Sequence, residues 1–246
     1  MKGLILAGGK ATRLRPLTWV TNKHLLPIYN KPMIFYALES MQRAKILEVL
    51  ITSSAEHLPH FINLLKSGKD FGLKLSYAIQ DDAGGGISQA ISLAEDFSGR
   101  EKIMVVLGDN LFTHDLYQAT VNFEKQTVGA KVFAKRMPTE SKQYGVIELN
   151  KNGKVISIEE KPEHPKSDLA QTGIYMYDKR VYEFIRSLKP SARGELEVTD
   201  LNNAYVKDGT MTCEVMKGWW VDAGTSFDEL LRANNLVAEL IRTGNQ

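Results

Sequence analysis

The chain opens with MKGLILAGGKATRLRPLT, in which the apolar residues 4–7 lead into the pair Gly8-Gly9 and then into positive charges. Glycines after a strand let a ligand approach the backbone, and their N–H groups can point at an anion. Arg13 and Lys23 can then donate charge-assisted hydrogen bonds to phosphate. The alternative is a tight turn with a solvated basic face. The stretch matches neither G-x-x-x-x-G-K-[ST] nor G-x-G-x-x-G, which disfavours a P-loop ATPase and an ordinary NAD dehydrogenase.

Two aspartates are candidates for holding Mg²⁺, which prefers one or two carboxylates together with substrate phosphates. Asp109, in LGDN, directly follows the apolar residues 103–107, and Asp222 lies in WWVDAGT near the last predicted helix. Asp109 could instead cap a helix or form a turn. Thr225 or Ser226 suits the capping of the last helix better than Asp222 does, which leaves Asp222 for another task.

A lysine at a predicted strand end completes this set, and no nucleophile accompanies it. Lys161 stands in EEKP before a proline turn, where an exposed lysine is the alternative. Cys213 has no evident base, G-x-S-x-G is absent, and the five histidines lack metal-ligand spacing, which disfavours acyl transfer and zinc hydrolysis. Glycines, cations and two acids suit phosphoryl or nucleotidyl transfer, because that chemistry depends on positioning and charge neutralisation.

The composition is that of an ordinary globular protein. The 246 residues are 43% hydrophobic and 24% charged, with a net charge of +2 that is too small to indicate a nucleic-acid surface. No apolar run approaches the roughly 18 residues of a membrane span. The single cysteine excludes an intramolecular disulfide and fits a reducing compartment. We therefore expect a cytoplasmic protein that binds neither nucleic acid nor membrane.

Hydrophobic periodicity predicts two differently built halves in one domain, 1–246. In the first half, to about residue 128, strands at 3–7, 49–53, 73–79 and 103–107 alternate with helices at 32–45, 57–65 and 88–97. This alternation predicts a doubly wound, mostly parallel, Rossmann-like sheet. From about 129 to 246, short runs at 132–135, 146–149, 155–159 and 174–177 predict antiparallel strands, with helices at 179–188, 198–207 and 226–241.

The candidate residues of the first half fall just beyond predicted strands. Gly8-Gly9, Gln80 and Asp109 each follow the end of one. Ligands of open α/β sheets bind outside the carboxyl ends of the strands, so these residues are expected to line one crevice.

Eight stretches together resemble the sugar nucleotidyltransferases, and within that family most closely the thymidylyltransferases that act on glucose 1-phosphate. They occur in the family's order from residue 2 to about residue 235. The stretches are GLILAGGKATRLRPLT, NKHLLPIYNKPMI, VVLGDN, QYGVIEL, IEEKPEHPKS, TGIYMYD, LKPSARGELEVTDLN and WWVDAGT.

The resemblance implies Mg²⁺-dependent formation of dTDP-glucose from dTTP and glucose 1-phosphate, with release of pyrophosphate, by a homotetramer of the nucleotidyltransferase fold. It implies nucleotide binding by Leu6, Gly8, Gly9, Arg13, Lys23, Gln80, Gly86 and Asp109, with Gln80 and Gly86 reading the base. It implies a sugar-binding second half in which Gly145, Glu160, Lys161, Tyr175 and Glu195 bind the sugar phosphate, and a metal held by Asp109 and Asp222. Arg13, Lys23, Lys161 and Asp109 would be catalytic.

This activity agrees with the residue inventory. The attacking sugar phosphate oxygen is already anionic near neutral pH, so the reaction needs no general base, and cations must offset the repulsion between two polyanions. Two rivals stay open: uridylyl or another nucleotidyl transfer to a related sugar phosphate, and a non-catalytic regulatory homologue.

Two local features depart from the family pattern. Ala11 replaces the last glycine of GG-x-G, so a positive φ there would strain the loop. The loop at 80–89 is one residue longer than expected.

Overall fold

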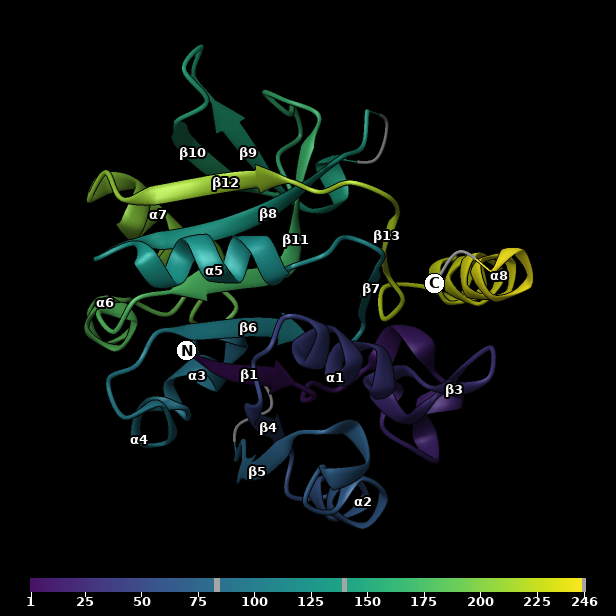
Figure 1. The fold of residues 1–246 in the computed structure, drawn as a ribbon. Helices are drawn as coiled ribbons and strands as arrows, with labels where there is room; N and C mark the ends of the chain where they lie inside the picture. The colour runs from purple at the N-terminus through teal and green to yellow at the C-terminus, as the bar shows by residue number, and fades with distance from the viewer. Residues whose placement is uncertain (82–84, 139–140, 245–246) are drawn as a thin grey trace.

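The computed structural model describes residues 1–81, 85–138 and 141–244, and a nine-stranded mixed sheet runs through it (Figure 1). The expected α/β fold with a mixed central sheet is confirmed. In spatial order the strands are β10 (Val155–Glu160), β9 (Gly145–Leu149), β11 (Leu169–Tyr177), β6 (Ile103–Leu107), β1 (Lys2–Leu6), β4 (Glu48–Ser53) and β5 (Lys74–Ile79), with β8 (Ala130–Arg136) paired to both β11 and β12 (Met211–Val215).

The two halves of the chain share this sheet. Strands β6, β1, β4 and β5 are parallel, as expected for the first half. β11 then pairs antiparallel with β6, at Tyr175↔Val105 and its neighbours, and continues the sheet into the second half. β12 is parallel to β8, whereas the other pairs of the second half are antiparallel. The division into halves near residue 128 stays a prediction.

Helices cover both faces of the sheet, because alternate residues of the central strand point to opposite sides. Leu4 and Leu6 of β1 belong to one buried apolar cluster, and Ile5 and Ala7 belong to the other. The Ile5 side is covered by α1 (Met33–Arg43), α2 (Leu58–Leu65) and α5 (Tyr117–Lys125), and the Leu4 side by α3 (Gly86–Ser92), α6 (Val181–Ser187) and α7 (Val198–Lys207).

The C-terminal helix α8 (Phe227–Thr243) packs on a separate small sheet, which the sequence did not predict. That sheet pairs β7 (Asn110–Phe112) with β13 (Trp220–Asp222). α8 lies beside β13 in Figure 1, and it also contacts β2 (Pro27–Ile28), which pairs with β3 (Lys31–Pro32). The third buried cluster joins α8 to this sheet through residues that include Val237, Val221 and Leu111.

The element boundaries test the periodicity argument. The strand at 103–107 and the helix at 198–207 are confirmed to the residue. The single helix expected over 88–97 is wrong: α3 ends at Ser92, and a separate α4 (Glu95–Ser98) follows. The hydroxyl of Tyr182 donates to the Ala94 carbonyl between them, so a tertiary contact from α6 holds the break. Across the described residues, the structure contains no helix long and apolar enough to cross a membrane.

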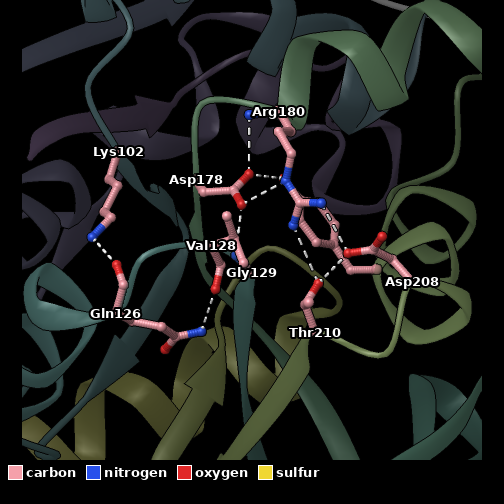
Figure 2. Close-up of polar contacts among 9 residues, drawn as sticks. Lys102, Gln126, Val128, Gly129, Asp178, Arg180, Asp208 and Thr210 are labelled. Carbon is pink, nitrogen blue, oxygen red and sulfur yellow. Dashed lines mark hydrogen bonds and ion pairs between the residues drawn. The ribbon is translucent and has the colours of Figure 1, made fainter.

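The buried carboxylate of Asp178 links several segments around the C-terminal end of β11 (Figure 2). Asp178, just after β11, accepts hydrogen bonds from the Gly129 backbone N–H (2.6 Å), the Tyr205 hydroxyl (2.8 Å) and Nε of Arg180 (2.9 Å). Arg180 extends this network to Asp208, at 3.0 Å. Because Asp178 is only 2% exposed, its protein partners must replace the water that a carboxylate would otherwise bind.

We expect Asp178→Asn to lower the free energy of unfolding by about 3 kcal/mol, the scale for breaking a buried ion pair. The amide turns an acceptor atom into a donor and leaves Arg180 without its buried counter-charge. Urea denaturation followed by circular dichroism measures the loss. Asp168→Asn is the matched control: Asp168 also binds an arginine, Arg136 (2.7 Å), but that pair is exposed, so the change is expected to stay below about 1 kcal/mol. Equal losses in the two variants would contradict the role given to burial.

Candidate active site

A cavity of about 240 Å³ lies beyond the carboxyl ends of the parallel strands. Leu6 and Leu107 end two adjacent strands and are paired in register, so the loops that follow them start side by side. Of the residues that the structure describes, twelve line the cavity, among them all but one of those expected to bind the nucleotide. The lining residues are Leu6, Gly8, Gly9, Lys23, His24, Gln80, Gly86, Ile87, Ala90, Leu107, Asp109 and Glu195.

Glycine is required at two of these positions for different reasons. A Cβ on Gly8 would lie 2.4 Å from Oε1 of Gln80, so only a glycine lets the Gln80 side chain reach this loop. Gly86, at φ +87°, has a left-handed backbone, and a Cβ there would lie 2.7 Å from the Leu196 carbonyl oxygen. Gly86 thus brings the start of α3 against the segment that contains Glu195. Residues 82–84, in the loop expected to be one residue too long, lie outside the described residues.

A capped turn of helix fixes Lys23. The 3-10 helix η3 (Lys23–Leu25) begins at Asn22, whose side-chain oxygen accepts from the His24 N–H at 2.9 Å. The Asn22 amide group donates to the carbonyl of Ala7, next to the glycine pair, at 3.1 Å. Burial and the charge of Lys23 lower the pKa of His24 to about 3, so its ring is neutral. Lys23 is therefore the cation that this turn presents to the cavity.

The two aspartates converge although they lie more than a hundred positions apart in the sequence. Asp222 of β13 pairs with Asn110 of β7, the neighbour of Asp109. The backbone N–H of Ala223 donates to the Asp109 carbonyl at 2.9 Å. Lys23 donates from Nζ to Oδ2 of Asp109 at 2.5 Å. The missing side chain of Gly224 makes this possible, because a Cβ there would lie 2.2 Å from Asp109 Oδ2.

The charges at this point are incompletely balanced. The pKa of Asp109 is lowered, and among the groups that lower it the charge of Lys23 acts most strongly. The pKa of Asp222 is raised, first by burial and then by the negative charge of Asp109. Asp222 resists ionisation because the positive charge near the two acids is too small to balance two carboxylates. A divalent cation bound between them would supply the missing charge. The described residues contain no group of three or more acids, histidines or cysteines that could hold a metal. Asp109 and Asp222 could thus supply two ligands, with phosphate oxygens and water as the rest.

The residues expected to bind the sugar phosphate form a neighbouring group. Glu160 pairs with Gly145 across β10 and β9, and its Oε2 accepts from the hydroxyl of Thr199 at 2.8 Å. Lys161 follows at φ +45°, with Nζ 3.9 Å from Oε1 of Glu160 and the side chain 43% exposed. Tyr175 is buried, and the charges of Glu160, Asp222 and Asp109 help to raise its pKa. Tyr175 therefore lies within electrostatic range of both groups.

Three expected features need separate comment. Arg13 does not line the cavity; it is exposed on η1 (Thr12–Leu14), close enough for its charge to lower the pKa of Lys23. Glu195, expected on the sugar side, lines the cavity with the nucleotide candidates instead. Ala11 does have positive φ, +47°, so the strain expected where glycine is usual is confirmed.

The structure also decides the alternative roles considered for the two acids. The start of α5 uses Asp115, whose Oδ1 accepts from the Tyr117 N–H at 2.9 Å, so Asp109 is not its cap. Ser226 caps α8, as expected, by accepting from the Glu229 N–H at 3.1 Å. Asp222 does accept from the Gly224 N–H at 3.2 Å and so makes a turn contact as well.

Sequence reasoning missed several polar residues of the sugar side. Gln171, Thr199 and Asn202 are buried beside Glu160 and Tyr175. Thr199 and Asn202 were within the quoted stretch LKPSARGELEVTDLN, and their spacing of three on a helix, which places both on one face, could have indicated them. Gln171 had no such signal, because its strand is buried on both faces.

Three comparisons with known proteins agree with this geometry. The family model described as nucleotidyl transferase matches residues 2–239. A glucose-1-phosphate thymidylyltransferase of Neisseria meningitidis serogroup A is 46% identical over 92% of this chain and 78% of its own length, and one of Mycolicibacterium smegmatis is 41% identical over 96% and 82%.

Solved structures give the same result. A crystal structure described as that of a glucose-1-phosphate thymidylyltransferase from Bacillus anthracis, in complex with sucrose, superposes with a TM-score of 0.91 at 47% identity, over 96% of this chain and 94% of that one. A UDP-glucose pyrophosphorylase complexed with UDP-glucose superposes with a TM-score of 0.85 at 27% identity, over 97% and 98%.

We expect millimolar Mg²⁺ to raise the melting temperature of the wild-type protein but not that of Asp222→Asn, because the variant lacks one ligand charge. In EDTA at pH 8 the variant should melt at the same temperature as wild type or higher. Folding raises the pKa of Asp222 from 3.8 to about 7, first through burial. The cost of its ionisation therefore grows between these two values and is complete above the folded-state pKa, so the difference between the variant and the wild type should shrink as the pH falls toward 3.8. Differential scanning fluorimetry measures both effects.

Asp115→Asn is the matched control, since Asn can still accept from the Tyr117 N–H. This variant should respond to Mg²⁺ as the wild type does. An equal Mg²⁺ response in Asp222→Asn would show that Asp222 is not a ligand.

Proposed function

This chain belongs to the nucleotidyl transferase family, and on that premise we propose that it transfers a thymidylyl group from dTTP to glucose 1-phosphate. The products are dTDP-glucose and pyrophosphate. The observation that supports this most is the convergence of Lys23, Asp109 and Asp222 between a cavity with a glycine-rich wall and the Glu160 group. A charge-neutralising centre between two groups of binding residues is what joining two polyanions requires.

The nucleotide occupies the cavity. Gln80 is fixed by its hydrogen bond to Gln89 (2.9 Å) and reads the base edge beside Gly86. Leu6, Ile87 and Leu107 give the cavity an apolar wall for the flat base. The phosphates lie over Gly8 and Gly9, where backbone N–H groups are accessible, and the exposed Arg13 side chain meets their outgoing end.

Asp109 and Asp222 hold Mg²⁺, which when bound neutralises phosphate charge and helps to align the reacting groups. Lys23, held beside Asp109, adds a fixed positive charge at the transferring phosphoryl group.

The sugar phosphate binds on the other side of this centre. Glu160 and the small residue Gly145 bind sugar hydroxyls, Tyr175 borders the site, and Lys161 binds the sugar phosphate. The attacking oxygen of the sugar phosphate is already anionic near neutral pH, and it attacks the α-phosphorus of the nucleotide in line with the departing pyrophosphate. No protein group has to remove a proton, which agrees with the low pKa of His24, because burial and the charge of Lys23 make this histidine of the cavity wall a very weak base.

Uridylyl transfer is the second candidate, favoured by the structural similarity to UDP-glucose pyrophosphorylase. Uracil and thymine share a hydrogen-bonding edge and differ by a methyl group. One such group changes selectivity by about 1–3 kcal/mol, so we expect UTP to be a second substrate.

Pyrophosphate release tests the proposal. With glucose 1-phosphate and Mg²⁺, we expect dTTP to be turned over best, UTP with kcat/KM lower by about tenfold to two-hundredfold, and both reactions to stop in EDTA. Asp222→Asn should lower kcat by about a hundredfold or more, while Asp115→Asn stays near wild type. No release from any triphosphate and sugar phosphate would favour the regulatory homologue.

A homotetramer is the expected assembly. Large apolar side chains are unusually open in the single chain, among them Trp19 (72% exposed), Val20 (86%) and Leu231 (60%), and contacts between copies would cover such surface. Light scattering at micromolar concentration should give four times the chain mass, and a monomer would contradict the assembly. The cytoplasmic location also stays a prediction.

A further inference from the structure

A chain of buried polar side chains runs from the interior of the second half to the sugar side. The Tyr177 hydroxyl donates to Oδ1 of Asn202 at 2.7 Å, and the Asn202 amide donates to Oε1 of Gln171 at 3.1 Å. Gln171 also lies close enough to Tyr175 to lower the pKa of that phenol, against the larger effect of burial, which raises it. Tyr177 and Asn202 are fully buried, whereas Gln171 is 7% exposed. This series of hydrogen-bonded side chains is therefore accessible from outside only at its Gln171 end.

The bond from Asn202 fixes which way the Gln171 amide faces. Oε1 is occupied by the Asn202 donor, so the NH₂ group points to the other side. That group has two N–H donors. The group can therefore donate to a ligand on the side that faces Gly145.

Gly145 lies beside this donor. A Cβ on Gly145 would lie 3.6 Å from Nε2 of Gln171 and 3.5 Å from Oε2 of Glu160. Gly145 has an ordinary backbone, and a Cβ there would make only ordinary van der Waals contacts, so neither conformation nor packing within the protein requires glycine at this position. A donor and a carboxylate acceptor thus border one small space above a glycine.

We propose that Gln171 determines sugar selectivity by donating a hydrogen bond to one hydroxyl of the sugar. The same hydroxyl donates a hydrogen bond to the Glu160 carboxylate. A hydroxyl both donates and accepts, so it matches this pair of groups, which neither a hydrogen nor a methyl group would satisfy. The inference rests on the proposed function and names a specificity residue that the function alone does not require.

One helix holds both partners of that hydroxyl. Thr199 and Asn202 lie three residues apart on α7, and they bind Glu160 and Gln171 respectively. The two groups therefore keep a fixed separation before the sugar arrives. A preorganised polar pair rejects an analogue that lacks the matching hydroxyl, because its groups would be left buried and unpaired.

The wild-type enzyme gives the first test. We expect that among 2-, 3-, 4- and 6-deoxyglucose 1-phosphate, one analogue loses about a hundredfold in kcat/KM. Loss of all turnover with glucose 1-phosphate itself would overturn the proposed function and this inference with it. Normal turnover with no preference among the analogues would overturn the inference alone.

Gln171→Met gives the second test, since methionine matches glutamine in length but cannot donate. The kcat/KM for glucose 1-phosphate should fall by about tenfold to a hundredfold, with little change for the sensitive analogue and an unchanged KM for dTTP. An equal loss for the parent sugar and all four analogues would mean that Gln171 is only structural.

Two more variants separate selectivity from folding. Tyr177→Phe removes a hydroxyl at the closed end of the same chain, so it should lower the melting temperature while the ranking of the analogues persists. Gly145→Ala fills the space above residue 145 and should raise the KM for glucose 1-phosphate at least tenfold without changing the KM for dTTP. An unchanged sugar KM in Gly145→Ala would overturn the proposed position of the hydroxyl, even if Gln171→Met failed to fold.

Discussion

Repulsion between like charges is the constraint around which this molecule is built. Two carboxylates, Asp109 and Asp222, are held close enough for the charge of one to raise the pKa of the other, and Asp109 is buried while Asp222 is partly buried. Left alone, such a pair would neutralise or separate. Lys23 offsets part of the repulsion, and the surrounding backbone prevents separation. The negative charge that remains would attract a cation. The repulsion that destabilises the pair is therefore also what would let the pair bind a metal ion.

The sheet positions this charged centre between the residues proposed to bind the two substrates. Because β11 pairs with β6, residues of the second half are hydrogen-bonded directly to the strand that ends two residues before Asp109. Tyr175 lies on that shared border and is affected by the charges of both groups. The two binding regions are parts of one continuous sheet, so their separation is set by strand spacing and not by a flexible linker.

The sequence revealed the parts of the site that depend on local chain order. Gly8, Asp109 and Lys161 follow strands that apolar runs identify, and a strand end places a side chain at the edge of the sheet wherever the strand lies. The convergence of Asp222 with Asp109 was expected from the resemblance, but periodicity could not locate β13, because three residues are too short to show a period.

Gln171 was missed for a related reason. Its importance depends on a helix thirty residues later and on a glycine in another strand. Such roles are set by tertiary contacts, which one sequence does not display. The break within residues 88–97 was also not predicted, and there the Ala94 carbonyl, between α3 and α4, accepts a hydrogen bond from a hydroxyl of α6.

The short β7–β13 ladder has a consequence for how the protein is made. Its three residue pairs join segments about 110 positions apart, and the last of them brings Asp222 to its place. On the ribosome the glycine loop, Lys23 and Asp109 emerge early, together with the parallel strands that support them. A nascent chain can thus assemble the part of the cavity wall that the first half supplies well before the second acid has been synthesised. The charge cluster closes late, after most of the hydrophobic core is available to hold it.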